Sequence, residues 1–415
     1  MEMISTTLDA IEKEKRYGAH NYSPMPVVLT SGQGVSVWDA EGKHYYDFLS
    51  AYSAVNQGHC HPKIVDAMVT QAKTITLTSR AFYNDKLGLA EEYICKYFGY
   101  DKSLFMNSGA EAVETAIKLV RKWGYKKKNL SEGTAEIAVV GGNFHGRTTG
   151  IISFSTDTSS TDGFGPMMQG YHIIPYNDAP ALEKILAGNP NICGFLLEPI
   201  QGEAGVLVPD DGYLSAVQAI CKKYNVKLII DEIQTGIGRT GKRLASDYDK
   251  VKADILILGK ALSGGVIPVS AVLCDDEIML CIQPGEHGST FGGNPIAAVV
   301  TIASLEVMEE ESLTENSYQM GQIFRERMSR LKDKRPDIIS AVRGKGLLNA
   351  MDIIPGEKTG TAGNVCLALM ENGLLCKPTH QHTIRFSPPL VITEEQIHTC
   401  CDIIEKVILA IEVNH

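Results

Sequence analysis

The chain has 415 residues, of which 44% are hydrophobic and 21% charged, and its formal net charge is −10 at pH 7. This length predicts roughly two or three domains, and the composition is typical of a folded globular protein rather than a disordered one. The acidic balance argues against nucleic acid as a partner, and the absence of a run of about 18 uncharged apolar residues argues against a membrane span.

The chain begins with MEMISTTLDAIEKEKRYG, in which four acidic residues lie among the first fourteen. Transit peptides are rich in arginine and poor in acids, and secretory peptides need an apolar centre, so this start resembles neither. The ten cysteines form no CxxC pair, which favours reduced thiols over a disulfide framework. We therefore expect a cytoplasmic protein.

Residues 1–49 contain alternating apolar and polar residues around two turn-forming stretches. The stretches are Gly32-Gln33-Gly34 and Asp39-Ala40-Glu41-Gly42, whose glycines, aspartate and glutamine suit tight turns. This part of the chain therefore predicts small antiparallel strands.

From about residue 100 to 300, short apolar runs alternate with amphipathic helical patterns. One such helix contains residues 112–120 and another residues 214–221, each with one apolar face. The runs are rich in Val, Ile and Leu, which indicates strands buried on both faces of a mainly parallel sheet in an α/β protein. The predicted strands are EIAVVGG (136–142), CGFLLEP (193–199), VKLIIDE (226–232), DILILGK (254–260) and PVSAVLC (268–274).

The C-terminal part changes pattern again. After a long helical pattern that begins near Pro295, VRGKGLLNAMDI predicts a strand, NVCLALMENG a helix ended by Gly373, and TIRFSPPLVIT an extended segment. Thr393 and Gln396 form a capping-box pattern for a last helix. The expected divisions are residues 1–49 for the N-terminal segment of a small domain, 50–300 for a large domain, and 301–415 for a long connecting helix and the rest of the small domain.

Two strand ends carry reactive groups. Lys260 follows the strand DILIL and Asp231 ends the strand KLII, so both should lie at the sheet edge where open α/β proteins bind ligands. A buried amine there has its charged form disfavoured and becomes a nucleophile that forms imines. With a carboxylate nearby it suits pyridoxal phosphate, because the lysine takes the aldehyde and the acid keeps the ring nitrogen protonated. Taken alone, Lys260 is better explained as an exposed lysine after a strand, and an aspartate at a strand end is commonly a turn or cap residue.

A phosphate group also needs a binding site, and the sequence offers one at a helix start. Ser108, Gly109 and Ala110 begin a helical pattern, where free backbone N–H groups and the helix dipole favour an anion. An ordinary N-cap at Ser108 predicts the same sequence, so both interpretations stay open.

Two other kinds of motif are weaker. GIGRTG (236–241) matches the G-x-G-x-x-G pattern of nicotinamide-dependent dehydrogenases, but four residues separate it from the preceding strand and little apolar helix follows. GHCHP (58–62) and THQHT (379–383) offer histidines, yet adjacent residues cannot easily face one metal ion. We expect no metal site and keep an NAD-dependent dehydrogenase as a remote alternative.

Motifs along the whole chain resemble those of the class-III aminotransferases of fold type I, which use pyridoxal phosphate. The similarity runs from YGAHNYSPMPVVL through SAVNQGHCHPKIV, LTSRAFYN, NFHGRT, EPIQGEAGV, DEIQTGIGRTG, LGKALSGG, PGEHGSTFGGNP and VRGKGLL to IRFSPPLVIT. The resemblance implies a large domain with a mainly parallel seven-stranded sheet flanked by helices and a small α+β domain from both termini. It also implies a homodimer with shared active sites.

The resemblance implies a role for each residue of the cofactor site. Thr290 in GSTFGGNP resembles the residue that reaches the phosphate in the neighbouring subunit, so a single chain should be inactive. The other cofactor-binding residues implied are Lys260 for the aldehyde, Asp231 for the ring nitrogen, Gln234 for the ring hydroxyl, Phe144 for stacking, and Ser108, Gly109 and Ala110 for the phosphate.

Within the class, Tyr22 and the wording AVNQGHCHP resemble the members that use ornithine. This implies transfer of the δ-amino group of L-ornithine to 2-oxoglutarate, with Lys260 moving the proton from the substrate δ-carbon. The products would be glutamate and glutamate 5-semialdehyde, which cyclises to pyrroline-5-carboxylate, a reaction of proline biosynthesis and arginine metabolism. Acetylornithine and 4-aminobutyrate aminotransferases remain alternatives, and an aminomutase or a non-catalytic cofactor-binding protein of this fold is more remote.

The stretch LEPIQGEAG (197–205) places two acids after a predicted strand. By resemblance, Glu203 neutralises Arg385 while ornithine is bound and swings aside for a dicarboxylate. Leaving one member of a buried ion pair alone costs about 3–5 kcal/mol, so the switch works only if the incoming carboxylate replaces Glu203. Glu198 is interpreted as a structural acid that accepts nearby hydrogen bonds. The substrate residues implied are Tyr22 and Arg147 for the α-amino-acid end of ornithine, Tyr52 for pocket shape, Glu203, and Arg385 for the α-carboxylate of glutamate.

Two positions depart from the family pattern. Ile267 in GGVIPVSA stands where an aromatic residue is usual, and Phe291 in GSTFGGNP replaces a more frequent tyrosine. Both keep an apolar body, so we expect an effect on pocket width or substrate affinity and none on the chemistry.

Overall fold

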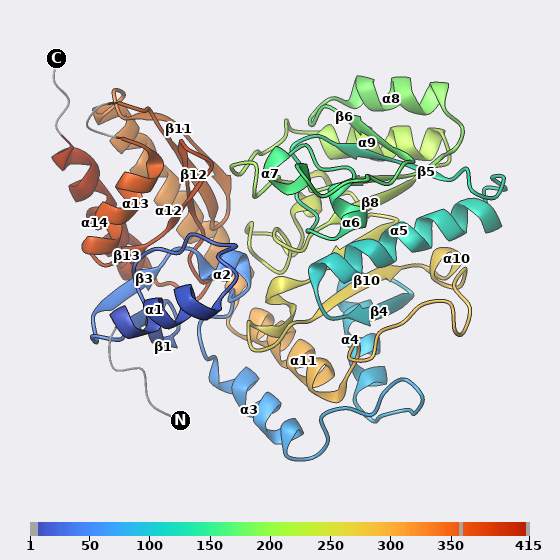
Figure 1. Cartoon of the computed structure of the whole chain (residues 1–415), viewed down its shortest axis with the longest axis horizontal. Helices are drawn as coiled ribbons and strands as arrows, with labels where there is room; N and C mark the ends of the chain where they lie inside the picture. Colours follow the sequence, from blue (N-terminus) through green and yellow to red (C-terminus); the bar gives the residue numbers. More distant parts are fainter. Residues whose placement is uncertain (1–6, 357–359, 412–415) are drawn as a thin grey trace.

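The computed structural model describes residues 7–356 and 360–411. Figure 1 shows them as two lobes. The large lobe contains a seven-stranded sheet, and the small lobe contains two four-stranded sheets made from both ends of the chain. No helix within these residues combines the length and apolarity needed to cross a bilayer. The division of the chain at residues 49 and 300 stays a prediction.

The seven-stranded sheet has the order β4-β10-β9-β8-β7-β5-β6. Its pairs are parallel except for those of β10, which runs antiparallel to both β4 and β9. All five strands expected from the sequence are present, and the two edge strands, β4 and β6, were not expected. The strands are β4 (Lys102–Met106), β5 (Glu136–Val140), β6 (Tyr171–Ile174), β7 (Ile192–Leu197), β8 (Lys227–Asp231), β9 (Ile255–Leu258) and β10 (Ser270–Cys274).

Helices cover both faces of this sheet. Val139 and Leu196 belong to the core cluster beneath α5 (Gly109–Lys126), on one face. Their neighbours Val140 and Leu197 belong to the cluster beneath α8 (Ala179–Gly188) and α9 (Tyr213–Lys223), on the other face. Because successive strand residues point to opposite faces, both sets must be apolar, which explains the continuous apolar runs.

The small lobe joins strands from both ends of the chain, since β3 pairs in parallel with β13. The segment VRGKGLLNAMDI, expected to be one strand, is a hairpin with Gly346 in its turn at a φ of 52°. The first sheet holds β1 (Leu29–Gln33), β2 (Ser36–Asp39), β3 (His44–Asp47) and β13 (Leu374–Leu375), and the second β11 (Ile339–Lys345), β12 (Leu348–Ile353), β15 (Thr383–Phe386) and β14 (Lys377–Thr379).

The long helical pattern near Pro295 is two helices, because Ser312 adopts a φ of 51° between them. The last helix begins at the expected capping box of Thr393 and Gln396. The remaining helices are α1 (Thr7–Tyr17), α2 (Ser50–Ser53), α3 (Pro62–Ala72), α4 (Leu87–Phe98), α6 (Thr149–Ile152), α7 (Thr158–Thr161), α10 (Asp276–Met279), α11 (Pro295–Glu310), α12 (Leu313–Lys334), α13 (Ala362–Glu371) and α14 (Glu394–Ala410), with 3-10 turns at Ala245–Asp249 and Lys260–Ser263.

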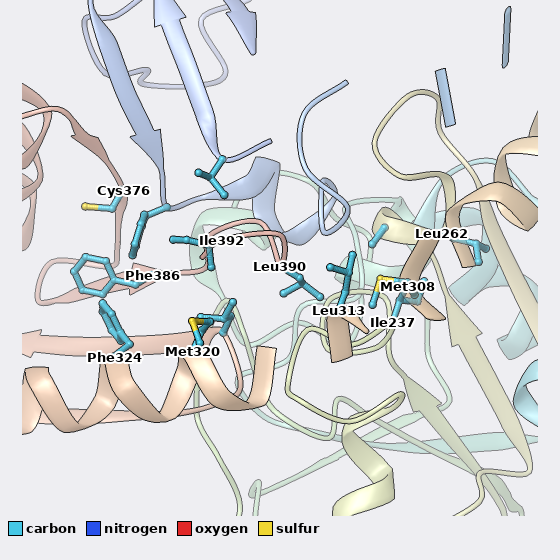
Figure 2. Packing of buried hydrophobic residues seen from close by; sticks show 14 of the residues in the cluster. Ile237, Leu262, Met308, Leu313, Met320, Phe324, Cys376, Phe386, Leu390 and Ile392 are labelled. Atoms are coloured by element: carbon cyan, nitrogen blue, oxygen red, sulfur yellow. The ribbon is translucent and has the colours of Figure 1, made fainter. Parts of the chain in front are cut away.

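The two lobes share one apolar core. Figure 2 shows its buried side chains continuing from Leu262 and Met308 to Phe324 and Phe386 in the small lobe. Arg239 of GIGRTG is fully buried and crosses the same junction. Its guanidinium donates hydrogen bonds to Asn56 Oδ1 at 2.6 Å, to the Leu347 carbonyl at 3.0 Å and to the Pro388 carbonyl at 2.6 Å. The glycine motif therefore forms an inter-lobe turn, and the apolar helix that a dinucleotide loop requires does not follow it.

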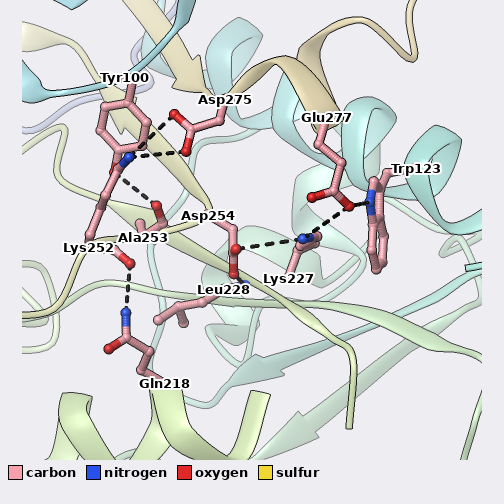
Figure 3. Close-up of polar contacts among 10 residues, drawn as sticks. All are labelled: Tyr100, Trp123, Gln218, Lys227, Leu228, Lys252, Ala253, Asp254, Asp275 and Glu277. Carbon is pink, nitrogen blue, oxygen red and sulfur yellow. Dashed lines mark hydrogen bonds and ion pairs between the residues drawn. The ribbon is translucent and has the colours of Figure 1, made fainter. Parts of the chain in front are cut away.

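A polar network holds the amino-terminal ends of β8 and β9 (Figure 3). Lys227 Nζ lies 3.8 Å from Asp254 Oδ1 and 3.5 Å from Glu277 Oε1. Trp123 Nε1 donates to Glu277 at 2.9 Å, and Asp254 accepts from the Leu228 N–H at 2.8 Å. Since Asp231 and Lys260 follow the other ends of these strands, the network anchors the sheet edge opposite to them.

Candidate functional site

A cavity of about 200 Å³ lies at the carboxyl ends of the central parallel strands. Its walls come from the start of α5, from the segments that follow β5, β7 and β8, and from the turn after β9. This is the edge where open α/β sheets bind ligands. The expected site residues that line it are Gly109, Ala110, Phe144, Glu203, Asp231, Gln234 and Lys260.

Lys260 is held in an uncommon backbone conformation at the end of β9. Its φ is 44°, in the left-handed region that non-glycine residues adopt only at a cost and that recurs at functional sites. Burial lowers the pKa of its amine to about 8, although Glu203 and Asp231 oppose this shift. A larger fraction of the amine is therefore neutral near pH 7 than for an exposed lysine, which is the form that attacks a carbonyl.

Asp231 is buried beside a histidine. Oδ2 of Asp231 lies 2.7 Å from Nδ1 of His145, and Oδ1 accepts the N–H of Ile233 at 3.0 Å. Burial by itself would lower the pKa of His145, but the Asp231 carboxylate outweighs this and raises it. The pair therefore fixes the orientation of the Asp231 carboxylate, as a partner for a protonated ring nitrogen requires.

Ser108 is the N-cap residue of α5. Its hydroxyl accepts the N–H of Glu111 at 3.2 Å, and its own N–H donates to the Glu111 carboxylate at 2.9 Å, which is a complete capping box. The N–H groups of Gly109 and Ala110 belong to the first turn and have no intrahelical acceptor. Because both residues line the cavity, the helix start also suits an anion. A contact between Ser108 and phosphate stays a prediction.

Glu203 and Arg385 meet across the junction of the two lobes. Arg385 Nη1 lies 2.7 Å from Glu203 Oε1 and 3.4 Å from Gln234 Oε1, and Gln234 Nε2 donates to Glu203 at 3.0 Å. Burial alone would raise the pKa of Glu203, but Arg385, Lys260 and Gln234 together lower it to about 2. The Tyr52 ring centroid lies 5.1 Å from the Arg385 guanidinium. Gln234 thus contacts this ion pair, and its contact with a ring hydroxyl stays a prediction.

Six expected site residues lie outside the lining of the cavity, namely Ser108, Tyr52 and Arg385, described above, and Arg147, Tyr22 and Thr290. The Arg147 guanidinium lies 5.5 Å from the Phe144 ring and donates to Ser160 Oγ at 3.1 Å, which places it beside the cavity wall. Tyr22 is 69% exposed, near Lys377 of β14, and Thr290 is exposed in the loop before α11. Their substrate and cofactor contacts stay predictions.

The two positions that depart from the family pattern also lie outside the lining. Ile267 packs, partly buried, against the main core, and Phe291 is 56% exposed. Their expected effect on the pocket stays a prediction.

Several cavity residues were missed by sequence reasoning. Glu198, interpreted as structural, does accept the N–H of Phe144 at 3.0 Å, but it also lines the cavity. His145 lies between Phe144 and Arg147 in the motif NFHGRT. Its position between two expected site residues was the signal that could have identified it. Gly146, Ile233 and Thr235 complete the wall.

The side chains present fit pyridoxal phosphate. A nucleophilic amine matches its aldehyde, a buried carboxylate its ring nitrogen, the Phe144 ring its aromatic face, and the free N–H groups of α5 its phosphate. All of these groups face one cavity.

Comparison with known proteins agrees with this geometry. The family model Aminotransferase class-III matches residues 17–408. The chain belongs to the class-III aminotransferases.

This aminotransferase is similar to the mitochondrial ornithine aminotransferase of Drosophila melanogaster, with 58% identity over 96% of the chain and 91% of the relative. A crystal structure of ornithine aminotransferase from Toxoplasma gondii superposes with a TM-score of 0.96 and 44% identity, covering 98% of this chain and 96% of that one. Acetylornithine aminotransferase from Elizabethkingia anophelis is similar with a TM-score of 0.88 and 54% identity, covering 97% and 99%.

The expectation of a cytoplasmic location is wrong by these comparisons. The relatives from Drosophila melanogaster, Rattus norvegicus and Oryza sativa carry the word mitochondrial in their names, whereas the Plasmodium falciparum relatives do not. An acidic start and reduced cysteines therefore do not locate a member of this family.

Proposed function

We propose that this aminotransferase transfers the δ-amino group of L-ornithine to 2-oxoglutarate with pyridoxal phosphate. The observation that carries the proposal is the Glu203–Arg385 ion pair in the neighbourhood of the Lys260 amine. An enzyme that alternates between a diamino acid and a dicarboxylate needs an arginine that is masked for one substrate and available for the other. The similarity to named ornithine aminotransferases supports the same conclusion.

The residues of the cavity have separate roles in the reaction. When bound, the cofactor supplies an aldehyde that accepts the amino group and a ring that withdraws electrons. Lys260 Nζ would hold the cofactor by its aldehyde between turnovers and would move the proton from the substrate δ-carbon. Asp231, fixed by His145, would keep a positive charge on the ring nitrogen. The products are glutamate 5-semialdehyde, which cyclises to pyrroline-5-carboxylate, and glutamate.

Arg385 distinguishes the two half-reactions. While ornithine is bound, Glu203 neutralises the guanidinium and Arg147 with Tyr22 holds the α-amino-acid end. The α-carboxylate of 2-oxoglutarate displaces Glu203 in the second half-reaction. Arginine suits this exchange because its planar fork meets a carboxylate with two parallel hydrogen bonds.

We also propose a homodimer in which each subunit completes the other's site. Support comes from exposed large aromatic side chains: Phe291, next to Thr290 in the chain, is 56% exposed, Phe82 71% and Tyr83 98%. Such large aromatic side chains are enriched at protein interfaces. Thr290 would then reach the phosphate bound by α5 of the partner subunit.

The test is a substrate panel on the cofactor-loaded protein, read by loss of the cofactor's visible absorbance. We expect ornithine to react faster than N-acetylornithine and 4-aminobutyrate, and Lys260→Ala to show neither the lysine-linked absorbance nor turnover. A faster response to N-acetylornithine would favour an acetylornithine aminotransferase, the second candidate function. The similarity to the Elizabethkingia anophelis protein supports that candidate. Multiple turnover by Lys260→Ala would overturn the assignment of the lysine.

A further inference from the structure

Three carboxylates line the cavity, and two of them have a cationic partner. Asp231 bonds to His145 and Glu203 to Arg385, each at 2.7 Å. Glu198 accepts the backbone N–H of Phe144 at 3.0 Å, and within residues 7–356 and 360–411 no ion pair of Glu198 is found. Glu198 is therefore the one acid of the cavity wall, in that part of the chain, whose charge is not balanced by a partner.

The surroundings of Glu198 make its ionisation sensitive to small changes. Burial is the largest influence and raises the pKa of Glu198 to about 7, against an ordinary value of 4.5. Asp231 and Glu203 add to this rise, whereas His145 and the Phe144 N–H oppose it. The titratable and charged groups that face Glu198 are His145, Asp231, Glu203, Lys260 and Tyr176, with Arg385 beyond Glu203.

The two substrates differ most in charge. Ornithine brings two ammonium groups and one carboxylate into the cavity, whereas glutamate and 2-oxoglutarate each bring two carboxylates. An ionised acid in a water-poor cavity attracts the former and repels the latter more strongly than it would in water. A neutral acid removes the repulsion and donates a hydrogen bond to a carboxylate.

We propose that Glu198 determines substrate preference through its protonation state, with the ionised carboxylate favouring the diamino acid and the protonated acid favouring the dicarboxylate. Binding of the dicarboxylate then takes up from solvent as much proton as the fraction of Glu198 that was ionised beforehand, at most one per site, and its departure returns that proton. This inference rests on the proposed function. It differs from the Glu203 switch, because Glu203 stays ionised near neutral pH and responds by moving.

The direction with pH follows from the raised pKa. Below about pH 6 Glu198 is mostly protonated, and above about pH 8 it is mostly ionised, so the ionised fraction rises about tenfold across that range. The protonated fraction falls about tenfold over the same range, so the rate constant for ornithine divided by that for glutamate should rise with pH, by up to about a hundredfold. Taking this ratio cancels the titration of groups that both half-reactions use, Lys260 included.

The test mixes the cofactor-loaded protein with ornithine or with glutamate alone and follows each single half-reaction by visible absorbance between about pH 6 and pH 8. In Glu198→Gln, whose amide still accepts the Phe144 N–H, the ratio should be flat and close to the wild-type value at the acidic end. Glu203→Gln removes a charge that raises the pKa of Glu198, so it should change the level of the ratio and move its midpoint to lower pH, while the rise with pH remains. Glu136 is a half-buried carboxylate beside His172 at the other end of β5, so Glu136→Gln should change neither the level of the ratio nor its pH dependence.

A second measurement is independent of activity. Because its folded-state pKa lies above the unfolded value, the contribution of Glu198 to stability is greatest below about pH 4.5 and falls as pH rises toward about 7. Glu198→Gln lacks this loss, so its melting temperature relative to wild type should rise over the same range in cofactor-free protein. This measurement also shows that the variant folds.

The outcomes separate the two proposals. A wild-type ratio that is flat with pH, or a Glu198→Gln ratio that keeps the wild-type slope, overturns the role of Glu198 while both half-reactions still proceed. Failure of the wild-type protein to react with ornithine or with glutamate overturns the proposed function, and the role of Glu198 with it.

Discussion

At the scale of single residues, the site depends on backbone conformations that side chains rarely adopt. Ser50, Ala51, Tyr52 and Ser53 have φ values of 50°, 46°, 60° and 72°, a left-handed turn that places the Tyr52 ring beside Arg385. Each such residue costs about 1–2 kcal/mol relative to a right-handed one. Lys260 has the same sign of φ. Other residues of the chain also have positive φ, but these five lie where Arg385 and the reactive amine are positioned, which fits a functional reason for the strain there.

Glu203→Ala should speed the glutamate half-reaction relative to the ornithine one. Without the carboxylate, Arg385 stands open to the α-carboxylate of glutamate, and no ion pair has to be broken before binding. A difference of about 1.4 kcal/mol corresponds to tenfold, so we expect a change in the ratio of roughly tenfold. The two single half-reactions measured at one pH check this. Equal effects on both would leave Glu203 as a structural partner of Arg385.

Sequence reasoning identified residues whose position follows from a strand end and missed those whose orientation depends on a distant segment. Lys260 and Asp231 could be placed because a buried strand precedes each of them. Glu198 also follows a strand, but its side chain is oriented by the N–H of Phe144, 54 positions earlier in the chain. Its place in the cavity wall therefore depends on how β5 and β7 pair, which a single strand pattern does not contain.

At the scale of elements, the same contrast separates central strands from edge strands. The five central strands were predicted because burial on both faces demands continuous apolar residues. The edge strands β4 and β6 are partly exposed and begin with Lys102 and Tyr171, so their composition is mixed. The hairpin of β11 and β12 was missed for another reason. A Cβ on Gly346 would lie 2.2 Å from the Thr240 carbonyl carbon, so this turn is fixed by a tertiary contact.

Lys227→Met should destabilise the large lobe without changing the half-reactions. The Lys227 side chain is 15% exposed, and its amine lies 4.7 Å from the Trp123 ring and faces two carboxylates, Asp254 and Glu277, which would lose their partner. We expect a loss of about 1–2 kcal/mol in the free energy of unfolding, measured by denaturant titration.

Lys252→Met is the matched control at the same edge of the sheet. Lys252 forms an ion pair with Asp275 in which both side chains are about half exposed. Loss of this pair should therefore lower the free energy of unfolding by less than about 0.5 kcal/mol. Equal losses in the two variants would show that burial of Lys227 adds nothing. A change in either half-reaction rate would contradict the placement of this network at the edge opposite to the cavity.

At the scale of the whole molecule, the site draws on both lobes and, by the proposal above, on two chains. Glu203 and Lys260 follow strands of the large lobe, whereas Arg385 lies on β15 of the small lobe, 182 positions from Glu203. The shared core and Arg239 fix the lobes to each other, which keeps this pair at bonding distance. Strand patterns alone do not predict that Glu203 and Arg385 lie together. That prediction came only from the family resemblance.

Shared sites predict that two inactive variants restore each other. Thr290→Asp places a carboxylate where the partner's phosphate should bind, and Lys260→Ala removes the amine, so each homodimer should be inactive. In a mixed dimer, one site combines Lys260 of one chain with Thr290 of the other and is intact, while the second site carries both changes. Random exchange makes half of the dimers mixed, so the ceiling is roughly a quarter of wild-type activity.

The measurement is turnover with ornithine and 2-oxoglutarate after the two variants are unfolded together and refolded, with each variant refolded alone as the control. Recovery toward the expected ceiling requires Thr290 and Lys260 to act from different chains, because no exchange of subunits can repair a site built from one chain. Sites contained within single subunits would give no recovery at all. Full activity of Thr290→Asp alone would show that this exposed loop lies away from the phosphate, whatever the assembly of the protein.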